Sequence, residues 1–314
     1  LNEIEIGNKK DGARAQNDKL IIKGSLQLSQ NESKYYAYNE AGSQSAQKSY
    51  DLDYAKINLY SGTFSADKLL NTSGEKAAIY LRNMTNNIEG KVEFKMYGGI
   101  INGNVYAGST KNTSKPQDIM TKMKFYGGKV VARADNLSTA QKGGIFGQGV
   151  SNLYEGSSEI TLSGIFTIEG NVFGGANSVN STKAYGTANT NIVISSSSVK
   201  VNGNIYGGSN GVRSGNIDTQ NGYINGSTNI SIIAGTVSQN IYGGGYNCGI
   251  GSSTSELSIN MENAGTTNIN ISGGNVLGNI IGGSYQNYIG VSTNIKLIGG
   301  TIGKANSNGV YGGN

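Results

Sequence analysis

Apolar and polar residues alternate in short segments along most of this chain. In residues 228–232, isoleucines at positions 230 and 232 are separated by a polar residue, and this period of two predicts a strand with one buried face. The clearest copies span residues 190–194, 228–232, 267–271 and 293–297, and less regular copies span 56–59, 93–96, 122–125 and 159–162. The pattern therefore predicts repeated strands and no helix in these segments.

A second repeated unit has the sequence Asn-Ile/Val-Tyr-Gly-Gly, as in residues 240–244. Its spacing of roughly 27 to 40 residues lies in the range of repeats that form solenoids, propellers or arrays. Related copies occur at residues 104–108, 171–175, 204–208 and 279–283, and a copy without the asparagine occurs at 310–313. We therefore expect the chain to be built from stacked copies of one unit.

A third short apolar segment lies between these two units, as in Thr236 and Val237 after Gly235. Three short strands per turn, separated by Gly or Asn corners, predict an all-β parallel β-helix, which is a solenoid, of about eight or more rungs. Ser/Asn/Gly-rich stretches after the Gly-Gly pair, such as 209–227 and 246–265, explain the uneven spacing as loops of variable length.

The repeat divides the chain into two parts. Residues 55–314 carry the β-helix repeats, whereas residues 1–54 do not follow them and are predicted to form an N-terminal β cap with strands at 20–22 and 26–28. The final residues, 310–314, complete a repeat and do not resemble a cap, so we expect the parent protein to continue beyond this fragment.

Two columns of asparagine are expected to bond along the stack. Identical asparagines spaced at about 4.8 Å can form side-chain ladders. The first predicted ladder contains Asn104, Asn171, Asn204, Asn240 and Asn279, and the second contains Asn191, Asn229, Asn268 and Asn294. A column of outward threonines at 190, 228, 267 and 293 is the one array that would suit ice binding, and it is too narrow to favour that function.

Composition excludes several classes of function. The net charge of +5 is mild for 314 residues and does not indicate a nucleic-acid partner. With Cys248 as the single cysteine, no intrachain disulfide can form, and we expect a free thiol without a structural role. No stretch of about 20 apolar residues is present, so no membrane span is predicted.

The residues that catalysis would need are scarce. The chain has no histidine, and Asp51 with Asp53 forms the one tight acidic pair, followed by the weaker pair Glu3 and Glu5. Glycoside hydrolysis usually requires two facing carboxylates, and the regular repeats do not provide them on adjacent strands. Gly-rich runs also lack the Lys-Ser/Thr of a phosphate-binding loop. We predict no catalytic residue, no metal site and no cofactor.

One outward surface could bind a ligand. If Phe94 and Met96 point inward, as do their equivalents, then Tyr60, Tyr97 and Tyr126 form an exposed column, with Asn58, Lys95 and Lys124 in the column beside it. Flat aromatic faces next to ammonium groups suit a sugar, particularly an anionic one. The alternative is that the tyrosines only stabilise the sheet. Loop residues Lys111, Lys115, Lys129, Arg133 and Lys142 are expected to add positive potential.

With these Gly-Gly corners, asparagine columns and Asn-Ile/Val-Tyr-Gly-Gly units, residues 55–314 resemble the repeat-built passengers of bacterial surface adhesins and autotransporters. The resemblance implies a right-handed parallel β-helix. It also implies a non-catalytic protein, secreted or at the cell surface with an outer-membrane-anchored parent. Its partner would be a host or bacterial surface glycan or protein, and its flanks or ends could self-associate.

Two other functions stay open at this point. Many parallel β-helices degrade polysaccharides, so the chain could be such an enzyme or a phage tailspike-like depolymerase. It could also be a purely structural stalk or coat element that needs no ligand. Paired carboxylates in a groove would favour the enzyme.

Overall fold

The computed structural model describes most of the repeat region and short N-terminal strands. The described residues are 3–6, 21–23, 26–29, 35–38, 44–46, 54–65, 77–83, 89–108, 118–132, 143–150, 153–154, 156–177, 185–186, 189–211, 224, 226–248, 250, 252–253, 259–260, 265–285, 292–303 and 309–312. Within these ranges the chain is all-β and contains no helix.

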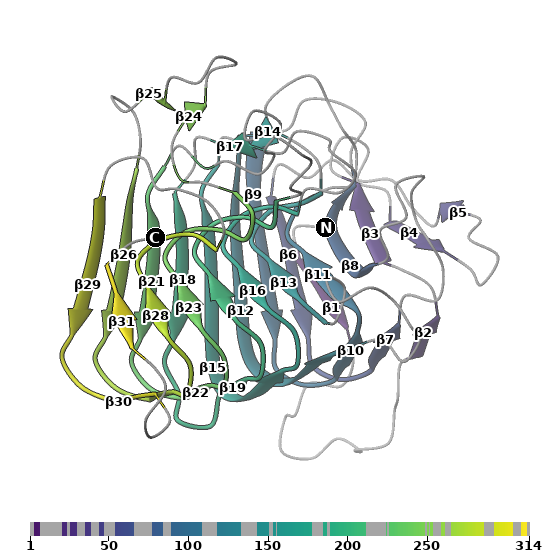
Figure 1. Cartoon of the computed structure of the whole chain (residues 1–314). Helices are drawn as coiled ribbons and strands as arrows, with labels where there is room; N and C mark the ends of the chain where they lie inside the picture. The colour runs from purple at the N-terminus through teal and green to yellow at the C-terminus, as the bar shows by residue number, and fades with distance from the viewer. Residues whose placement is uncertain are drawn as a thin grey trace.

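Two large sheets organise the molecule, and the first of them, sheet A, has two columns of strands (Figure 1). The first column is β1 (Glu3–Ile6), β6 (Tyr54–Leu59), β9 (Glu89–Met96), β12 (Asp118–Val131), β15 (Ser158–Ile168), β18 (Thr190–Ile194), β21 (Thr228–Ile232), β26 (Thr266–Ile271) and β29 (Ser292–Leu297). The second column is β2 (Ile21–Lys23), β7 (Thr63–Ser65), β10 (Ile100–Asn102), β19 (Lys200–Val201), β22 (Thr236–Val237), β27 (Asn275–Val276) and β30 (Thr301–Ile302). The long strands β12 and β15 bend and run through both columns.

Sheet B is the third column, and two small pairs lie outside both sheets. In spatial order sheet B contains β31 (Val310–Tyr311), β28 (Ile280–Ile281), β23 (Ile241–Tyr242), β20 (Ile205–Tyr206), β16 (Val172–Phe173), β13 (Ile145–Phe146), β11 (Asn104–Tyr106), β8 (Ala77–Asn83), β3 (Leu26–Ser29), β4 (Tyr35–Tyr38) and β5 (Gln44–Ala46). The small pairs are β14 (Leu153–Tyr154) with β17 (Tyr185–Gly186), and β24 (Ser252–Ser253) with β25 (Ile259–Asn260).

Equivalent strands pair in parallel and in phase from one pass of the chain to the next. We call one pass through the three columns a rung. Ile230 of β21 lies opposite Ile192 of β18 and Ile269 of β26, and the isoleucines two residues further on pair in the same way. The described strands are therefore parallel and in phase, as the spacing of the repeats predicted.

The N-terminal residues contribute to the same sheets. β1, β2 and β3 pair in parallel with β6, β7 and β8, so these three strands add a rung inside the segment 1–54, where the sequence showed no repeat. β4 and β5 then extend sheet B in antiparallel orientation. A capping role for residues 1–54 stays a prediction.

The main core lies between the columns and is formed by the inward residues of each strand. Strand β21 alternates buried and half-buried positions, with Ile230 and Ile232 almost fully buried. The other isoleucines predicted to be buried, at positions 192, 194, 205, 241, 269, 271 and 280, all lie in this core. The alternating pattern therefore assigned the inner face correctly, because burial of these side chains supplies the main stabilising free energy.

A second core lies on the other side of sheet B. The aromatic residues of the Asn-Ile/Val-Tyr-Gly-Gly units turn away from the main core and stack on one another, as in Tyr206 on Phe173 with ring centroids 4.7 Å apart. A series of single parallel bridges covers them, linking Val150, Asn177, Asn210, Tyr246 and Tyr285. The prediction that these aromatics serve packing is confirmed. The prediction that loops begin at 209 and 246 is wrong, since those residues belong to a fourth column.

The asparagine columns form the predicted side-chain ladders only in part. In the first column the side chain accepts from the backbone one rung further on: Asn240 N–H donates to Asn204 Oδ1 at 2.9 Å. Asn279 N–H likewise donates to Asn240 Oδ1 at 2.7 Å. In the second column, amide-to-amide bonds do form, from Asn268 Nδ2 to Asn229 Oδ1 and from Asn294 Nδ2 to Asn268 Oδ1, both at 3.0 Å. Asn229 instead donates to the Thr190 carbonyl.

A hydroxyl group closes each described rung from β12 onward. Thr228 Oγ1 donates to the Gly243 carbonyl of the same rung at 2.6 Å, and Thr190 and Thr267 repeat the contact with Gly207 and Gly282. These threonines are fully buried, so the expectation of an outward threonine column is wrong. The glycines are required by this close packing: a Cβ on Gly243 would lie 2.8 Å from the Cβ of Thr267.

Cys248 also departs from the expectation. Its thiol is free but fully buried, and Sγ donates to the Ser209 carbonyl at 2.9 Å. Burial raises the pKa of the thiol to about 12. The cysteine is therefore part of the packing between rungs and not an idle loop residue.

Candidate ligand-binding site

The three tyrosines of the predicted surface form one continuous stack. The ring centroids of Tyr60 and Tyr97 are 4.9 Å apart with planes 9° from parallel, and those of Tyr97 and Tyr126 are 5.1 Å apart at 16°. The stack forms because in-phase pairing places these residues one above another at the end of the first column, where Tyr97 N–H donates to the Leu59 carbonyl. The predicted column is present.

Stacking changes what the tyrosines can offer to a ligand. Tyr97 is 44% exposed, yet its two ring faces are covered by Tyr60 and Tyr126. The exposed part of the side chain is therefore its edge. The flat aromatic faces expected from the sequence are not available at Tyr97, because neighbouring rungs lie too close to admit anything between the rings.

The stack ends at Tyr126. The pairing of β12 with β15 shifts register here, so that Ser163 and Gly164 lie where β12 has the single residue Tyr126. Neither residue supplies a ring to continue the stack. Tyr126 is 36% exposed and is the last aromatic residue of this column.

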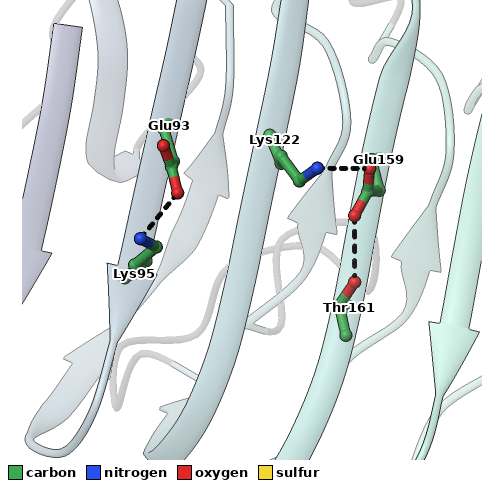
Figure 2. Close-up of polar contacts among 5 residues, drawn as sticks. All are labelled: Glu93, Lys95, Lys122, Glu159 and Thr161. Carbon is green, nitrogen blue, oxygen red and sulfur yellow. Dashed lines mark hydrogen bonds and ion pairs between the residues drawn. The ribbon is translucent and has the colours of Figure 1, made fainter.

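Lys95 and Lys124 lie in the column next to the stack, as predicted. Lys124 of β12 pairs with Lys95 of β9, which pairs with Asn58 of β6. Lys95 Nζ lies 2.7 Å from Glu93 Oε1 on the same strand (Figure 2). The hydrogen bond to Glu93 raises the pKa of Lys95 against the opposing effect of partial burial, and Tyr97 and Tyr126 add smaller increases. Glu93 therefore compensates the Lys95 charge.

A further row of outward side chains alternates in charge from strand to strand. Lys56, Glu93, Lys122 and Glu159 occupy equivalent positions on successive strands. Lys122 Nζ lies 3.0 Å from Glu159 Oε2, and Thr161 Oγ1 donates to the other Glu159 oxygen at 3.4 Å (Figure 2). Both carboxylates of the described part of this row are therefore engaged by lysines.

Two lysines near the stack lack a carboxylate partner within the part of the chain that the structure describes. Among the described residues, no ion pair involves Lys124 or Lys129. Lys129 was expected in a loop, but it lies on the second half of β12, where it is exposed and pairs with Ile100 and Thr167. The glycine pair Gly127 and Gly128, which marks the bend, was the sequence signal that could have assigned Lys129 to a strand. Lys111, Lys115, Arg133 and Lys142 lie outside the described residues.

The acidic pairs weighed for catalysis are not placed by the structure. Asp51 and Asp53 lie outside the described residues, and only the backbone of Glu3 and Glu5 is described, on β1. Among the described side chains, no group of three or more His, Cys, Asp or Glu residues is arranged to hold a metal ion. The described part of the chain also lacks a helix of the length and apolarity needed to cross a membrane.

Comparisons of the chain with protein-family models, with curated proteins and with solved structures gave no match. The function is therefore argued from the residues of the chain itself.

Proposed function

We propose that the chain is a right-handed parallel β-helix and that it acts as a non-catalytic, adhesin-type binding protein of a bacterial surface or secreted assembly. Its partner would be a host or bacterial surface glycan or protein. In-phase pairing of three columns over successive rungs supports the β-helix. The exposed tyrosine stack bordered by lysines is the observation that carries the binding function.

The position of the stack favours recognition on a rigid surface. Each tyrosine directly follows a residue that is buried in the main core, as Tyr97 follows Met96. A ligand would therefore meet side chains that are already ordered, and binding would cost little conformational entropy. Exposed apolar surface that is bordered by polar groups can mark a site of interaction, and Lys95 and Lys124 border this stack.

The alternative is a polysaccharide-degrading enzyme or tailspike-like depolymerase. It would need one carboxyl group as an acid and a second as a base or nucleophile. Glu93 and Glu159 lie on this face, but each is held by a lysine. This arrangement favours binding over cleavage. A purely structural stalk would show no ligand binding at all.

A triple variant tests the proposed function. Tyr60→Ala, Tyr97→Ala and Tyr126→Ala together should abolish binding of the purified protein to a glycan array and to intact cells. The far-ultraviolet circular dichroism should stay unchanged, since the stack lies outside the main core. Binding that survives this triple substitution at full strength would show that the stack serves the fold alone.

A further inference from the structure

Strand β12 places two unpaired lysines on either side of Tyr126. Lys124 lies in the part of β12 that belongs to the first column of strands, and Lys129 lies in the part that belongs to the second column. The strand bends between them at Gly127 and Gly128. Gly128 has a φ of 95°, and a Cβ there would lie 2.6 Å from the Gly99 carbonyl oxygen. Glycine therefore fixes the bend, and Lys124 and Lys129 lie two residues before and three residues after Tyr126, at the end of the tyrosine stack.

Lysines dominate the charge of the described residues at this corner. Glu169 lies two residues beyond Thr167, the partner of Lys129, and its carboxylate accepts a hydrogen bond from Ala132 N–H at 2.8 Å. Glu93 binds Lys95 and Glu159 binds Lys122, whereas no described carboxylate binds Lys124 or Lys129. Thr167 of β15 pairs with Lys129 on one side and with Lys200 of β19 on the other. The exposed Lys200 therefore lies two rungs from Lys129 in the same row of side chains. A ligand that crosses the rungs along this row would meet a second cation.

The tyrosine edges favour the same sign of ligand. The edge of an aromatic ring carries the positive end of its quadrupole, and the phenol hydroxyl is a hydrogen-bond donor. Ammonium groups beside such edges attract an anion. Both ring faces of Tyr97 are covered, so nucleic-acid bases have no platform between the rings of the stack, and single-stranded DNA is compared with acidic sugars below.

The geometry points to an acidic-glycan site at this corner, in which a carboxylate or sulfate group lies between Lys124 and Lys129 over the edge of Tyr126. This inference rests on the proposed function and narrows it to one ligand class. Lys95 contributes less than Lys124, because Glu93 already compensates its charge. From the sequence alone, Lys95 and Lys124 are equal candidates for ligand binding, and Lys129 is expected in a loop.

The test compares binding of four polymers to the purified chain at low ionic strength: dextran sulfate, alginate, neutral dextran and single-stranded DNA. Dextran sulfate and alginate distinguish a sulfate site from a carboxylate site. We expect one or both to bind, and the double variant Lys124→Gln with Lys129→Gln to lose roughly tenfold in affinity. The loss should shrink as salt is added, since exposed charges are screened over about 10 Å at 0.1 M.

Two single variants serve as matched controls. Lys296→Gln removes one charge at the position equivalent to Lys124, five rungs further along the stack. Lys122→Gln removes a lysine that is paired with Glu159. Neither should change affinity by more than about twofold. Tyr126→Phe removes a hydroxyl without disturbing the stack, and it should weaken binding about threefold.

The outcomes separate this inference from the proposed function. Equal binding of neutral dextran or of DNA, or an unchanged affinity of the double variant, would overturn the acidic-glycan site while leaving a surface-binding function in place. Absence of binding to every polymer, to a glycan array and to cells would overturn both. A loss of affinity in Lys296→Gln equal to that of the double variant would show that net charge, and not this corner, attracts the polymer.

Discussion

Individual side chains in this protein act through their copies in neighbouring rungs. The ring of Tyr206 contacts Phe173 on one face and Tyr242 on the other, with planes within 6° of parallel. Such stacks bury large apolar areas and fix the ring orientation. The same geometry on the outer surface covers the faces of Tyr97. Stacking at the rung spacing therefore serves packing inside sheet B and limits recognition outside it.

Burial of Tyr206 predicts a loss of stability at alkaline pH. Its pKa is raised mainly by burial and further by the neighbouring Tyr242, whereas the same phenol in the unfolded chain ionises near 10. Above about pH 10 the unfolded state releases a proton that the folded state keeps. The free energy of unfolding should therefore fall by up to about 1.4 kcal/mol per pH unit from this group.

Tyr206→Phe checks this expectation, because Phe146 and Phe173 occupy equivalent positions on neighbouring rungs. Urea unfolding of the parent and the variant should give similar stabilities at pH 7. Above about pH 10 the variant should lose stability less steeply with rising pH. Parallel pH profiles of the two proteins would show that Tyr206 does not govern the alkaline transition.

At the scale of the element, a rung is held by contacts within itself as well as by its neighbours. Backbone pairing joins each strand to the rungs on either side, and the threonine hydroxyl joins the first column to the third inside one rung. The alternating pattern predicted the strands and their inner faces. It could not predict the hydroxyl contact, because Thr228 and Gly243 are brought together only when the three columns close.

Thr228→Val should destabilise the protein, because it keeps the shape of the side chain and removes its hydroxyl. The Gly243 carbonyl would lose its hydrogen bond from Thr228 Oγ1 in a buried site, at a cost of about 1–3 kcal/mol. Thr228→Ser keeps the hydroxyl, as Ser158 does naturally in its contact with Gly174, and should cost less. Chemical denaturation of both variants measures the difference, and equal stability of Val and Ser variants would contradict the role of the hydroxyl.

Ile232→Asp should unfold several rungs. Ile232 is fully buried in the main core, and a buried carboxylate without a partner costs several kcal/mol. Ser231→Asp is the matched control, since its position on β21 alternates to the outer face. We expect a large drop in melting temperature for the first variant and a small one for the second. A parent-like melting curve for Ile232→Asp would disprove the inward assignment.

At the scale of the whole molecule, the sequence predicted the repeat, the sheet faces and the tyrosine column, because each follows from spacing alone. Other features depend on contacts between columns. The bridges through Asn177, Asn210 and Tyr246 were missed because they are single residues in Ser/Asn/Gly-rich segments. The pairing of Lys95 with Glu93 on its own strand was missed because it depends on side-chain conformation.

The purified protein should leave acidic and neutral polysaccharides uncleaved, with or without Ca²⁺. The absence of histidine and the engagement of Glu93 and Glu159 by lysines motivate this expectation. Release of reducing or unsaturated ends is the measurement. Cleavage that disappears in Asp51→Asn or Asp53→Asn would establish the enzyme in place of the binding protein.

The hydroxyl contact within each rung has a consequence for how this protein could diversify. Gly207 accepts from Thr190 in one rung, and Thr228 donates to Gly243 in the next. The connection between these rungs therefore starts and ends at rungs that are closed independently of it, so its length can change at an entropic cost that grows only slowly. New sequence could be accepted there while the framework stays constant, which makes this connection a suitable place for grafting foreign peptides.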